Sequence, residues 1–425
     1  MAALFAARSV RCTILTTPLQ ASTIRSIVDR ANTSLGFLRT AELLRKPFRR
    51  FLSDHNAEID AVVSDGIFHW SVDDAAEHGI PRITFLGTSM FARSCTEAML
   101  RNNPFEACSD DPATVVSLPG LPHRVVELRG QMMDPVKRPH EWALFQLIHA
   151  ADRRSYGELF NSFHELEPAY AEHYRAALHR RAWLVGPVAL ASGSGKDVTS
   201  SRGALAGALS PESIGCLRWL DEKPASSVLY VSFGTMTIFS PEQMRELARG
   251  LDLSGKNFVW VIANGSASTD LCMPDGFPMA HRGYIVRGWA PQVLILNHPA
   301  VGGYMTHCGW NSTLEAVSAG VPMVTWPRYF HHEKLVVEVL EAGIGVGAED
   351  YATWMETHRL IDSEVIAESI RKVMKKDTTW KKAEELGAKA RAAVEKGGSS
   401  YDDVGQLMEE LMARRCSGRT ARGQL

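Results

Sequence analysis

The sequence predicts an α/β protein with two domains, each built on a parallel sheet that helices cover on both sides. Short apolar runs typical of buried strands alternate with helix-forming stretches in both halves of the chain, which is the pattern of doubly wound sheets. The chain has 425 residues, more than one hydrophobic core usually supports. Residues 189–209 are rich in Ser, Gly and Ala and lack apolar periodicity, which predicts a linker between the domains.

The first domain is expected to span residues 1–188. Its predicted strands are residues 10–17, 59–64, 82–86 and 183–188. Its predicted helices are residues 1–8, 22–30, 38–52 and 71–78, followed by a mostly helical region over residues 140–178. Asp65 stands directly after the second of these strands. Because ligands of such sheets bind outside the carboxyl ends of the strands, Asp65 is a candidate site residue.

The second domain is expected to span residues 213–400, after a linker at 189–212 and before a helical tail at 401–425. Its predicted strands are residues 227–233, 257–262, 284–286 and 301–305. Its predicted helices are residues 214–221, 241–250, 313–319 and 333–341, and the chain is predicted to be helical from 363 to 415. The first of these strands runs into Gly234 and Thr235, where a loop meets a phosphate in doubly wound domains.

The composition disfavours several classes of protein. The net charge is −2 and no long basic run occurs, so nothing indicates nucleic-acid binding. The 7 cysteines are scattered and form no C-x-x-C pair, which favours reduced thiols in a cytosolic protein over a disulfide framework or a metal site. No apolar run approaches the length of a membrane span, and residues 1–7 lack the basic leader of a signal peptide. We therefore expect a soluble, cytoplasmic protein.

The most informative stretch covers residues 289–335. Trp289 follows a predicted strand and offers an aromatic plate on which a flat base could stack. Residues 306–312, THCGWNS, predict a turn that opens a helix, and the free amides of a helix start bind phosphate readily. Glu315 lies one helical turn after Asn311, on the same face. These groups, in this order, are typical of a site for a nucleoside diphosphate.

Each of these residues also has a purely structural interpretation. Ser312 and Glu315 match the S-x-x-E capping box, which stabilises helix starts in proteins of every function. Trp310 could be a core residue, and His307 could be a buried histidine with satisfied hydrogen bonds. Because short motifs often match by chance, the prediction of a nucleotide site rests on their combination.

Residues 289–329 resemble the signature box of plant secondary-product glycosyltransferases, the UDP-sugar-dependent enzymes that glycosylate small hydroxylated metabolites. Residues 155–174 are also similar to this family, and the resemblance extends over almost the whole chain. It implies the GT-B architecture, in which two doubly wound, Rossmann-like domains hold the nucleotide in the cleft between them.

The resemblance also implies a donor site for a UDP-sugar. The uracil and the ribose would be bound by Trp289, Ala290, Gln292 and Glu315. The phosphates would be bound by His307, Asn311, Ser312 and either Ser232 or Thr235. Trp310 would lie near the sugar.

The reaction implied by the resemblance is an inverting transfer. A base deprotonates the acceptor hydroxyl, which attacks C1 of the sugar as UDP leaves. The expected sugar is glucose, and the expected acceptor is a small plant metabolite such as a flavonoid or another phenolic. UDP-glucose or a related UDP-sugar is then a co-substrate, and neither a metal nor another cofactor is expected, since helix amides can replace a cation at the phosphates.

The first domain departs from the family pattern. The catalytic base of the family is a histidine in a Gly-His pair after the first strand, and this chain starts after that point. Asp65, within the sequence VVSDGIFHW, matches the charge partner of the absent histidine. His69 is near in sequence, but it lies beyond the end of the strand, which disfavours it as a substitute base. The loop between Asn32 and Phe37 is abrupt where the family has a further strand. We therefore expect an incomplete first sheet.

The end of the signature box also departs from the family, which has an acidic residue followed by Gln or His at the sugar hydroxyls. Counted from Trp289 without gaps, these places fall on His331 and His332. Counted back from Glu333, which matches the usual start of the next helix, both residues are deleted. The deletion keeps the following helix in register, so we adopt it and expect weaker binding of the sugar.

Two functional hypotheses follow. The first is a UDP-glycosyltransferase whose turnover is impaired by the missing base, least for acidic acceptors that ionise unaided. The second is a non-catalytic UDP-binding remnant, or the product of a mis-started gene, which the loss of the base and the sugar contacts favours. A nicotinamide dehydrogenase is disfavoured because no G-x-G-x-x-G follows any predicted strand.

Overall fold

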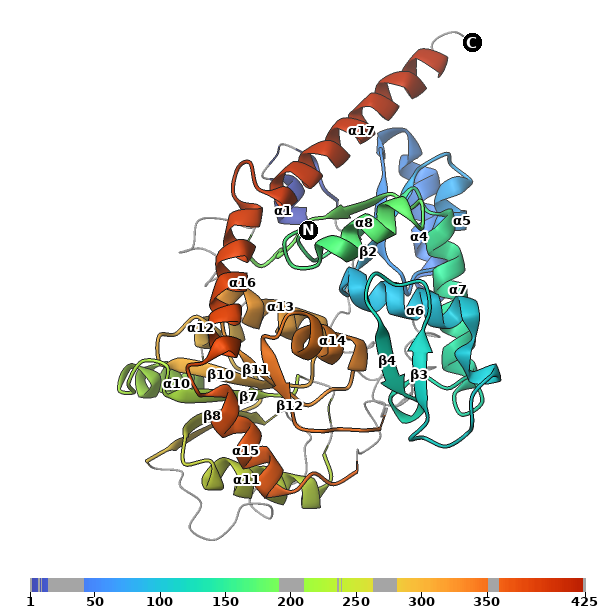
Figure 1. Cartoon of the computed structure of the whole chain (residues 1–425). Helices are drawn as coiled ribbons and strands as arrows, with labels where there is room; N and C mark the ends of the chain where they lie inside the picture. Colours follow the sequence, from blue (N-terminus) through green and yellow to red (C-terminus); the bar gives the residue numbers. More distant parts are fainter. Residues whose placement is uncertain are drawn as a thin grey trace.

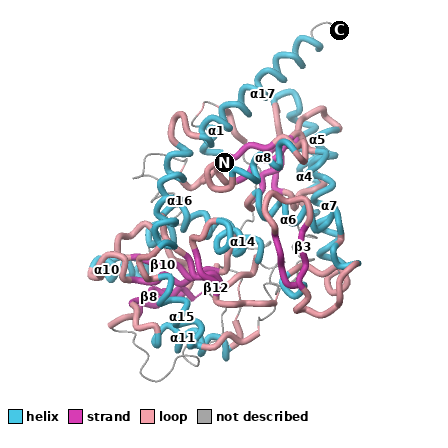
Figure 2. Tube along the Cα trace, viewed as in Figure 1, coloured by secondary structure: helices cyan, strands magenta, loops and turns pink. Residues whose placement is uncertain are grey.

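The computed structural model describes residues 2–6, 8, 10–13, 42–190, 210–234, 237, 239–262, 281–350 and 359–422. Two α/β units, each with its own parallel sheet, lie one above the other in Figure 1. Figure 2 shows the strands of both units with helices around them. The predicted fold class, two doubly wound domains of the GT-B type, is confirmed. The exact domain limits stay predictions.

The first sheet has four parallel strands within the described residues, in the order β1-β2-β5-β6. They are β1 (Val62–Asp65), β2 (Arg82–Leu86), β5 (Gly157–Phe160) and β6 (Ala182–Leu184). The helices of this half are α1 (Ala2–Ala6), α4 (Arg45–His55), α5 (Ser71–Ala76), α6 (Met90–Asn102), α7 (Pro139–Arg154) and α8 (Pro168–Ala176), with 3-10 turns at Asn56–Glu58, Pro104–Glu106 and Arg129–Gln131. An antiparallel hairpin is formed by β3 (Val115–Leu118) and β4 (Val125–Leu128).

The second sheet has six parallel strands in the described part of the chain, in the order β12-β11-β10-β7-β8-β9. They are β7 (Val228–Ser232), β8 (Asn257–Ile262), β9 (Gly283–Arg287), β10 (Val301–Thr306), β11 (Met323–Thr325) and β12 (Gly343–Gly345). The chain runs outward from β7 to β9 and then returns to pair β10 with the other edge of β7. The strand order therefore reverses between β7 and β10, and ligands bind in the crevice at such a switch point.

Helices cover both faces of the second sheet. They are α10 (Pro211–Asp221), α11 (Pro241–Leu253), α12 (Gln292–Leu296), α13 (Trp310–Ala319), α14 (Phe330–Lys334) with a π-helical turn at Leu335–Val339, α15 (Ser363–Val373) and α16 (Thr378–Val394). Alternate residues of β7 face opposite sides, as a strand requires. Tyr230 packs in one apolar cluster with Leu314 of α13, whereas Leu229 packs in another with Leu247 of α11 and Ile366 of α15.

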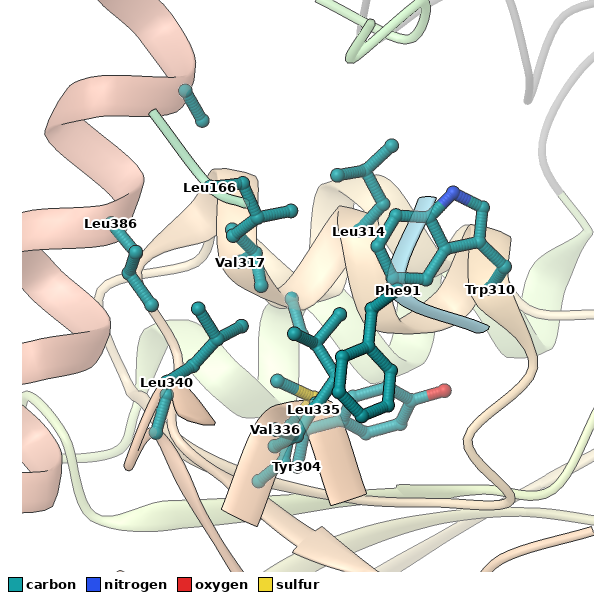
Figure 3. Close-up of a cluster of buried hydrophobic side chains, with 14 of the residues drawn as sticks. Phe91, Leu166, Tyr304, Trp310, Leu314, Val317, Leu335, Val336, Leu340 and Leu386 are labelled. Carbon is teal, nitrogen blue, oxygen red and sulfur yellow. The ribbon is translucent and has the colours of Figure 1, made fainter. Parts of the chain in front are cut away.

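One apolar cluster joins the two units. Figure 3 shows Phe91 and Leu166, from the first half of the chain, among side chains of the second half such as Trp310, Leu314 and Leu335. Removing this surface from water favours a fixed arrangement of the units. The two units are therefore held together by packed apolar side chains.

The sequence predicted the bounds of β2 and β8 correctly, but it missed several short strands. The region expected to be mostly helical contains β5, a buried strand of only four residues that separates α7 from α8. The short strands β11 and β12 and the β3–β4 hairpin were not predicted. Residues 10–13 of the predicted strand at 10–17 form no strand. The rest of that strand, the predicted helix at 22–30 and most of the linker lie outside the described residues.

The stretch predicted to be helical from 363 to 415 consists of three helices, α15, α16 and α17 (Ser399–Arg422). Asp377 starts α16 by accepting a hydrogen bond from the backbone N–H of Thr379, at 3.0 Å. Gly397, at φ 87°, lies between α16 and α17, in a conformation that glycine adopts without strain. Among the described helices, including α17 with 24 residues, we find no candidate for a membrane span.

Helix α17 brings the end of the chain back to the first sheet. Figure 1 shows it beside α1 at the upper unit. An apolar cluster contains residues of α1, the first sheet and α17, namely Leu4, Phe5, Ile83, Leu159, Trp183, Val185, Val404 and Leu407. The guanidinium of Arg8 also donates a hydrogen bond to the carbonyl oxygen of Tyr401 at 2.6 Å. Both ends of the described chain thus help to cover the first sheet.

Replacing Leu407 by alanine should lower the free energy of unfolding by about 2–5 kcal/mol, because this side chain is 0% exposed in the cluster that joins α17 to the first sheet. Met412→Ala is the matched control, since Met412 is a long apolar side chain of the same helix that is 56% exposed. Its effect should stay within about 0.5 kcal/mol. Urea unfolding followed by circular dichroism measures both. Equal effects would contradict the packing of α17 on the sheet.

Candidate active site

A cavity of about 960 Å³ opens between the two sheets. One wall comes from the second sheet and contains Trp289, His307 and the start of α13. The other comes from the first unit and contains Asp65 and one face of α7. Both sheets point the carboxyl ends of strands toward this cavity, since Asp65 ends β1 and Ser232 ends β7. The cavity therefore lies where parallel α/β sheets bind ligands.

The sequence predicted one side of this cavity well. All predicted donor residues in the described part of the chain line it, namely Ser232, Trp289, Ala290, Gln292, His307, Trp310, Asn311, Ser312 and Glu315. Thr235 lies outside the described residues. Trp289 is 51% exposed, which leaves its ring available to a flat ligand.

His307 follows β10 at the switch point and fits between two glycines. A Cβ atom at Gly309 would lie 2.4 Å from its Nε2, and one at Gly234 would lie 2.8 Å from its Cε1. Either methyl group would displace the ring, so both positions require glycine. Burial, together with the nearby Arg328 guanidinium, lowers the pKa of His307 to about 4, so the ring is neutral near pH 7. Its Nδ1 has no hydrogen-bond partner among the described residues, although it is buried.

The structure corrects the predicted start of the helix after His307. Helix α13 begins at Trp310 rather than at residue 313, and Gly309 occupies its N-cap position without any side-chain cap. Ser312 and Glu315 therefore form no capping box, since both lie inside the helix. Instead, the Gln292 amide donates hydrogen bonds to Ser312 Oγ at 3.2 Å and to Glu315 Oε2 at 2.8 Å. The amides of the first turn remain available to an anion.

Gln292 is fixed by two tyrosines behind the site. Its Oε1 accepts hydrogen bonds from the hydroxyl groups of Tyr304, at 3.1 Å, and Tyr230, at 3.4 Å. Burial raises the pKa of Tyr304 to about 12, so this hydroxyl remains a donor at neutral pH. The two predicted ribose ligands, Gln292 and Glu315, thus form one oriented pair.

Trp310 is both a cavity residue and a contact between the two units. Its side chain is only 3% exposed, and its indole N–H donates a hydrogen bond to the carbonyl oxygen of Asn161, after β5, at 2.7 Å. The His332 ring lies 5.1 Å from the Trp310 ring, centroid to centroid. The structural interpretation of Trp310 as a core residue is therefore correct, and one face of the residue still borders the cavity.

The histidines at the end of the signature box line the cavity but are already engaged. His332 Nδ1 lies 3.0 Å from the Cys308 carbonyl oxygen, and its Nε2 lies 2.9 Å from Thr88 Oγ1. His331 Nε2 lies 3.3 Å from a carboxylate oxygen of Glu127, a buried residue of β4. Both histidines therefore connect the signature box to the first unit.

Asp65 lines the cavity on the first-sheet side, whereas His69 does not. The Asp65 carboxylate accepts a hydrogen bond from the Ile67 amide at 2.9 Å. Loss of water around the carboxylate raises its pKa, although part of the side chain borders open space. His69 Nε2 lies 3.4 Å from Glu42 instead. The idea that His69 serves as the base therefore has no support in the geometry.

Most of the first-unit wall is apolar. It includes Phe85, Leu86, Ala92, Met99, Met132, Met133, Leu144, Phe145 and Ile148. Apolar walls with a few polar groups are typical of pockets for small molecules. Sequence reasoning identified none of these residues, nor Arg328 and His149, which also line the cavity. The helical spacing of residues 141, 144, 145, 148 and 149 was the only signal for the α7 face.

The fold is that of two-domain GT-B proteins, and the cavity lies at the switch point of the second sheet. A sequence profile described as UDP-glucoronosyl and UDP-glucosyl transferase matches residues 205–382. Similarity to curated relatives extends over nearly the whole chain. The chain belongs to the plant UDP-glycosyltransferase family.

Two relatives illustrate this similarity. UDP-glucose flavonoid 3-O-glucosyltransferase 7 of Fragaria ananassa is 38% identical over 456 residues, covering 97% of this chain and 92% of the relative. Scopoletin glucosyltransferase of Nicotiana tabacum is 37% identical, covering 98% of this chain and 95% of the relative. The first alignment is longer than the 425 residues of this chain, so the relative has internal segments that this chain lacks.

Solved structures agree with the fold. The UGT of Glycyrrhiza uralensis, complexed with glycyrrhetinic acid 3-O-monoglucuronide, matches with a TM-score of 0.84 and 33% identity, covering 99% of this chain and 90% of that one. The UGT of Medicago truncatula, complexed with UDP-glucose, matches with a TM-score of 0.78 and 25% identity, covering 96% and 94%.

His332→Gln should weaken the dependence of stability on pH. Burial lowers the pKa of His332 to about 3 from an ordinary value of 6.5, so between these values the unfolded chain binds a proton that the folded chain excludes. The resulting stability is fully present above pH 6.5 and is lost as the pH falls toward 3. Between roughly pH 4.5 and 6, the slope of unfolding free energy against pH should decrease by about 1.4 kcal/mol per pH unit.

Urea titrations at several pH values measure this slope. His140→Gln, at an exposed position, is the control and should leave the slope unchanged. An unchanged slope in the His332 variant would show that this ring is not held neutral by the fold.

Proposed function

We propose that this chain transfers glucose from UDP-glucose to a hydroxyl group of a flat, largely apolar phenolic such as a flavonoid, with inversion at C1. One observation carries the proposal: a single cavity joins the predicted donor residues on the second sheet to an apolar wall on the first. The relatives named as flavonoid and scopoletin glucosyltransferases support this class of acceptor.

The donor would lie along the second sheet. The uracil stacks on Trp289, and the ribose hydroxyls bind the oriented pair of Gln292 and Glu315. The diphosphate faces the start of α13, where backbone amides and the helix dipole favour negative charge. The neutral His307 ring lines the same part of the cavity and adds no charge there.

These groups would also assist departure of the diphosphate. Negative charge develops on the leaving oxygen as the bond to C1 breaks, and fixed dipoles aimed at that position stabilise it without reorganising. We therefore propose that transfer requires no added metal. Activity that persists in EDTA supports this point.

The acceptor would lie against α6 and α7. Methionine, leucine and phenylalanine side chains on these elements and on the loop before α7 suit a planar aromatic ring system. A cytoplasmic location fits the free thiols found among the described cysteines.

Release of UDP from UDP-glucose in the presence of a panel of phenolic acceptors tests the proposal. Acceptor-dependent release with formation of a glucoside is the expected result. UDP binding without any transfer would instead favour the alternative of a non-catalytic UDP-binding remnant. The impaired turnover expected from the sequence stays a prediction, because it depends on whether another side chain takes the acceptor proton.

Trp289→Ala should weaken UDP binding by about 1–3 kcal/mol, which is the range for a base stacked on an aromatic side chain. Calorimetry with UDP measures the change. Trp219→Ala is the control, since Trp219 lies on α10 and does not line the cavity. Equal affinity of the Trp289 variant and the unaltered chain would contradict stacking on this ring.

UDP-glucose and UDP should bind with nearly equal affinity. Both ring nitrogens of His332 are engaged by Thr88 and Cys308, so this histidine offers no free group to the sugar hydroxyls. One ring nitrogen of His331 lies beside the Glu127 carboxylate, which holds that ring toward the first unit. Competitive calorimetry compares the two ligands. A clear preference for UDP-glucose would mean that one of these histidines leaves its partner and binds the sugar.

A further inference from the structure

The acceptor wall of the cavity contains a slot between two antiparallel helices, α6 and α7. Near the start of α6, Arg93 pairs with Asp152, near the end of α7, at 2.9 Å. Just after α6, the Phe105 ring packs edge-on against Trp142, at the start of α7, with ring centroids 5.8 Å apart. The two helices therefore lie side by side along most of their length. The residues that line the slot include Ala92, Thr96 and Met99 of α6 and Glu141, Phe145 and Ile148 of α7.

The inner end of this slot lies beside the donor side of the cavity. Thr88, just before α6, places its Oγ1 2.9 Å from Nε2 of His332, in the signature box. A Cβ atom at Gly66, next to Asp65, would lie 3.1 Å from Cγ2 of Ile148. Since the second half of α7 lies next to the start of α6, the inner end of the slot is next to the signature box. An acceptor hydroxyl that attacks the sugar must lie at this end.

The outer end of the slot lies two helical turns away and carries Glu141. Glu141, Phe145 and Ile148 are spaced so that their side chains share one face of α7. Glu141 and Ile148 are separated by about 10 Å along the helix axis, at 1.5 Å per residue. Met99 lies equally far along α6 from Ala92. A molecule of two aromatic rings that holds one hydroxyl at the inner end therefore brings its far end near Glu141.

The Glu141 carboxylate keeps one oxygen for a ligand. Its Oε1 accepts a hydrogen bond from Arg138 Nη1 at 3.3 Å, and the side chain is 22% exposed. Its Oε2 makes no hydrogen bond with any described residue, and it is not among the buried polar atoms that lack a partner. Because a carboxylate oxygen accepts hydrogen bonds, Oε2 suits a hydroxyl group of a ligand in the cavity that Glu141 lines.

Glu141 also has a structural interpretation. It lies in the first turn of α7, where a negative charge interacts favourably with the helix dipole. Its ion pair with Arg138 lies at a partly exposed surface, and such pairs contribute little stability. Neither interaction involves a hydrogen bond to Oε2, so both are compatible with a ligand at this oxygen.

Glu141 is the ionisable group at the outer end. Arg93 and His149 also line the cavity, but they lie toward the inner end, where they are paired with Asp152, at 2.9 Å, and Glu97, at 2.7 Å. No other described residue of α6, of α7 or of the loop before α7 that lines the cavity is ionisable. The outer end therefore presents one carboxylate in mostly apolar surroundings.

We propose that Glu141 determines acceptor specificity, by selecting molecules with a hydrogen-bond donor at the end opposite the glycosylated hydroxyl. This inference rests on the proposed glycosyl transfer, which defines the end of the slot that reacts. The favoured class of acceptor is a two-ring phenolic with a hydroxyl group at each end. An acceptor with a carboxylate at its far end is disfavoured, because two negative charges would then face each other.

The test compares three stilbenes that differ only at the far ring: 4,4′-dihydroxystilbene, 4-hydroxy-4′-methoxystilbene and 4-hydroxystilbene-4′-carboxylate. Fluorescence titration of protein saturated with UDP measures their affinities. The diol should bind about 3- to 10-fold more tightly than the methoxy compound, which is the range for one hydrogen bond. The carboxylate should bind more weakly than the methoxy compound. In turnover, the same order should appear in KM, with little change in kcat.

Two substitutions separate hydrogen bonding from charge. Glu141→Leu removes both oxygens, so the preference for the diol should fall to the statistical advantage of its two equivalent orientations. Glu141→Gln keeps the size of the side chain and removes the charge, so the carboxylate should bind about as well as the methoxy compound. Glu172→Gln is the control, since Glu172 is an exposed residue of α8 that does not line the cavity. It should keep the order of affinities of the unaltered chain.

Equal affinities of the diol and the methoxy compound in the unaltered chain would overturn this role of Glu141, whether or not the variants fold. A preference for the diol that survives Glu141→Leu would overturn it as well, and so would a failure of all three stilbenes to bind. Selective binding that depends on Glu141, without formation of any glucoside, would support the role of Glu141 and overturn the proposed transfer instead.

Discussion

The hydrogen bond from the Trp310 indole to the Asn161 carbonyl is the contact on which the site most depends. It joins the first turn of α13, which faces the donor, to the end of β5 in the other unit. Asn161 is held in turn, because its Oδ1 accepts the Val188 amide at 3.0 Å. A Cβ atom at Gly186 would lie 2.6 Å from that oxygen, so only glycine fits there. The indole N–H and the apolar side chains around it are buried together between the units, and this contact favours the arrangement that encloses the cavity.

The residues between His307 and α13, where the phosphates would bind, are also fixed by close packing. Cys308, at φ 61°, turns the chain sharply between His307 and the helix, and Gly309 leaves room for the imidazole. The backbone therefore presents the start of α13 and the His307 ring to the same part of the cavity. A side-chain cap on α13 would compete with a phosphate for its amides, and Gly309 supplies none.

The donor side was predictable from the sequence because its residues are contiguous. From Trp289 to Glu315, the order of residues alone places them around one strand and one helix start. The error there was local: Ser312 and Glu315 matched a capping box, but Gly309 begins the helix three residues earlier. The acceptor side was not predictable, because it is assembled from distant segments. Glu97 and His149 are 52 residues apart and meet only through the packing of α6 on α7.

A buried ionic cluster holds the acceptor side in place. Arg82 and Arg93 pair with Asp152 at 2.8 and 2.9 Å, and Arg93 and Arg180 pair with Glu158 at 3.1 and 2.8 Å. Buried pairs of this kind contribute little net stability, but removing one partner costs about 3–5 kcal/mol. The position of α7 is therefore set by charge pairing as well as by apolar packing.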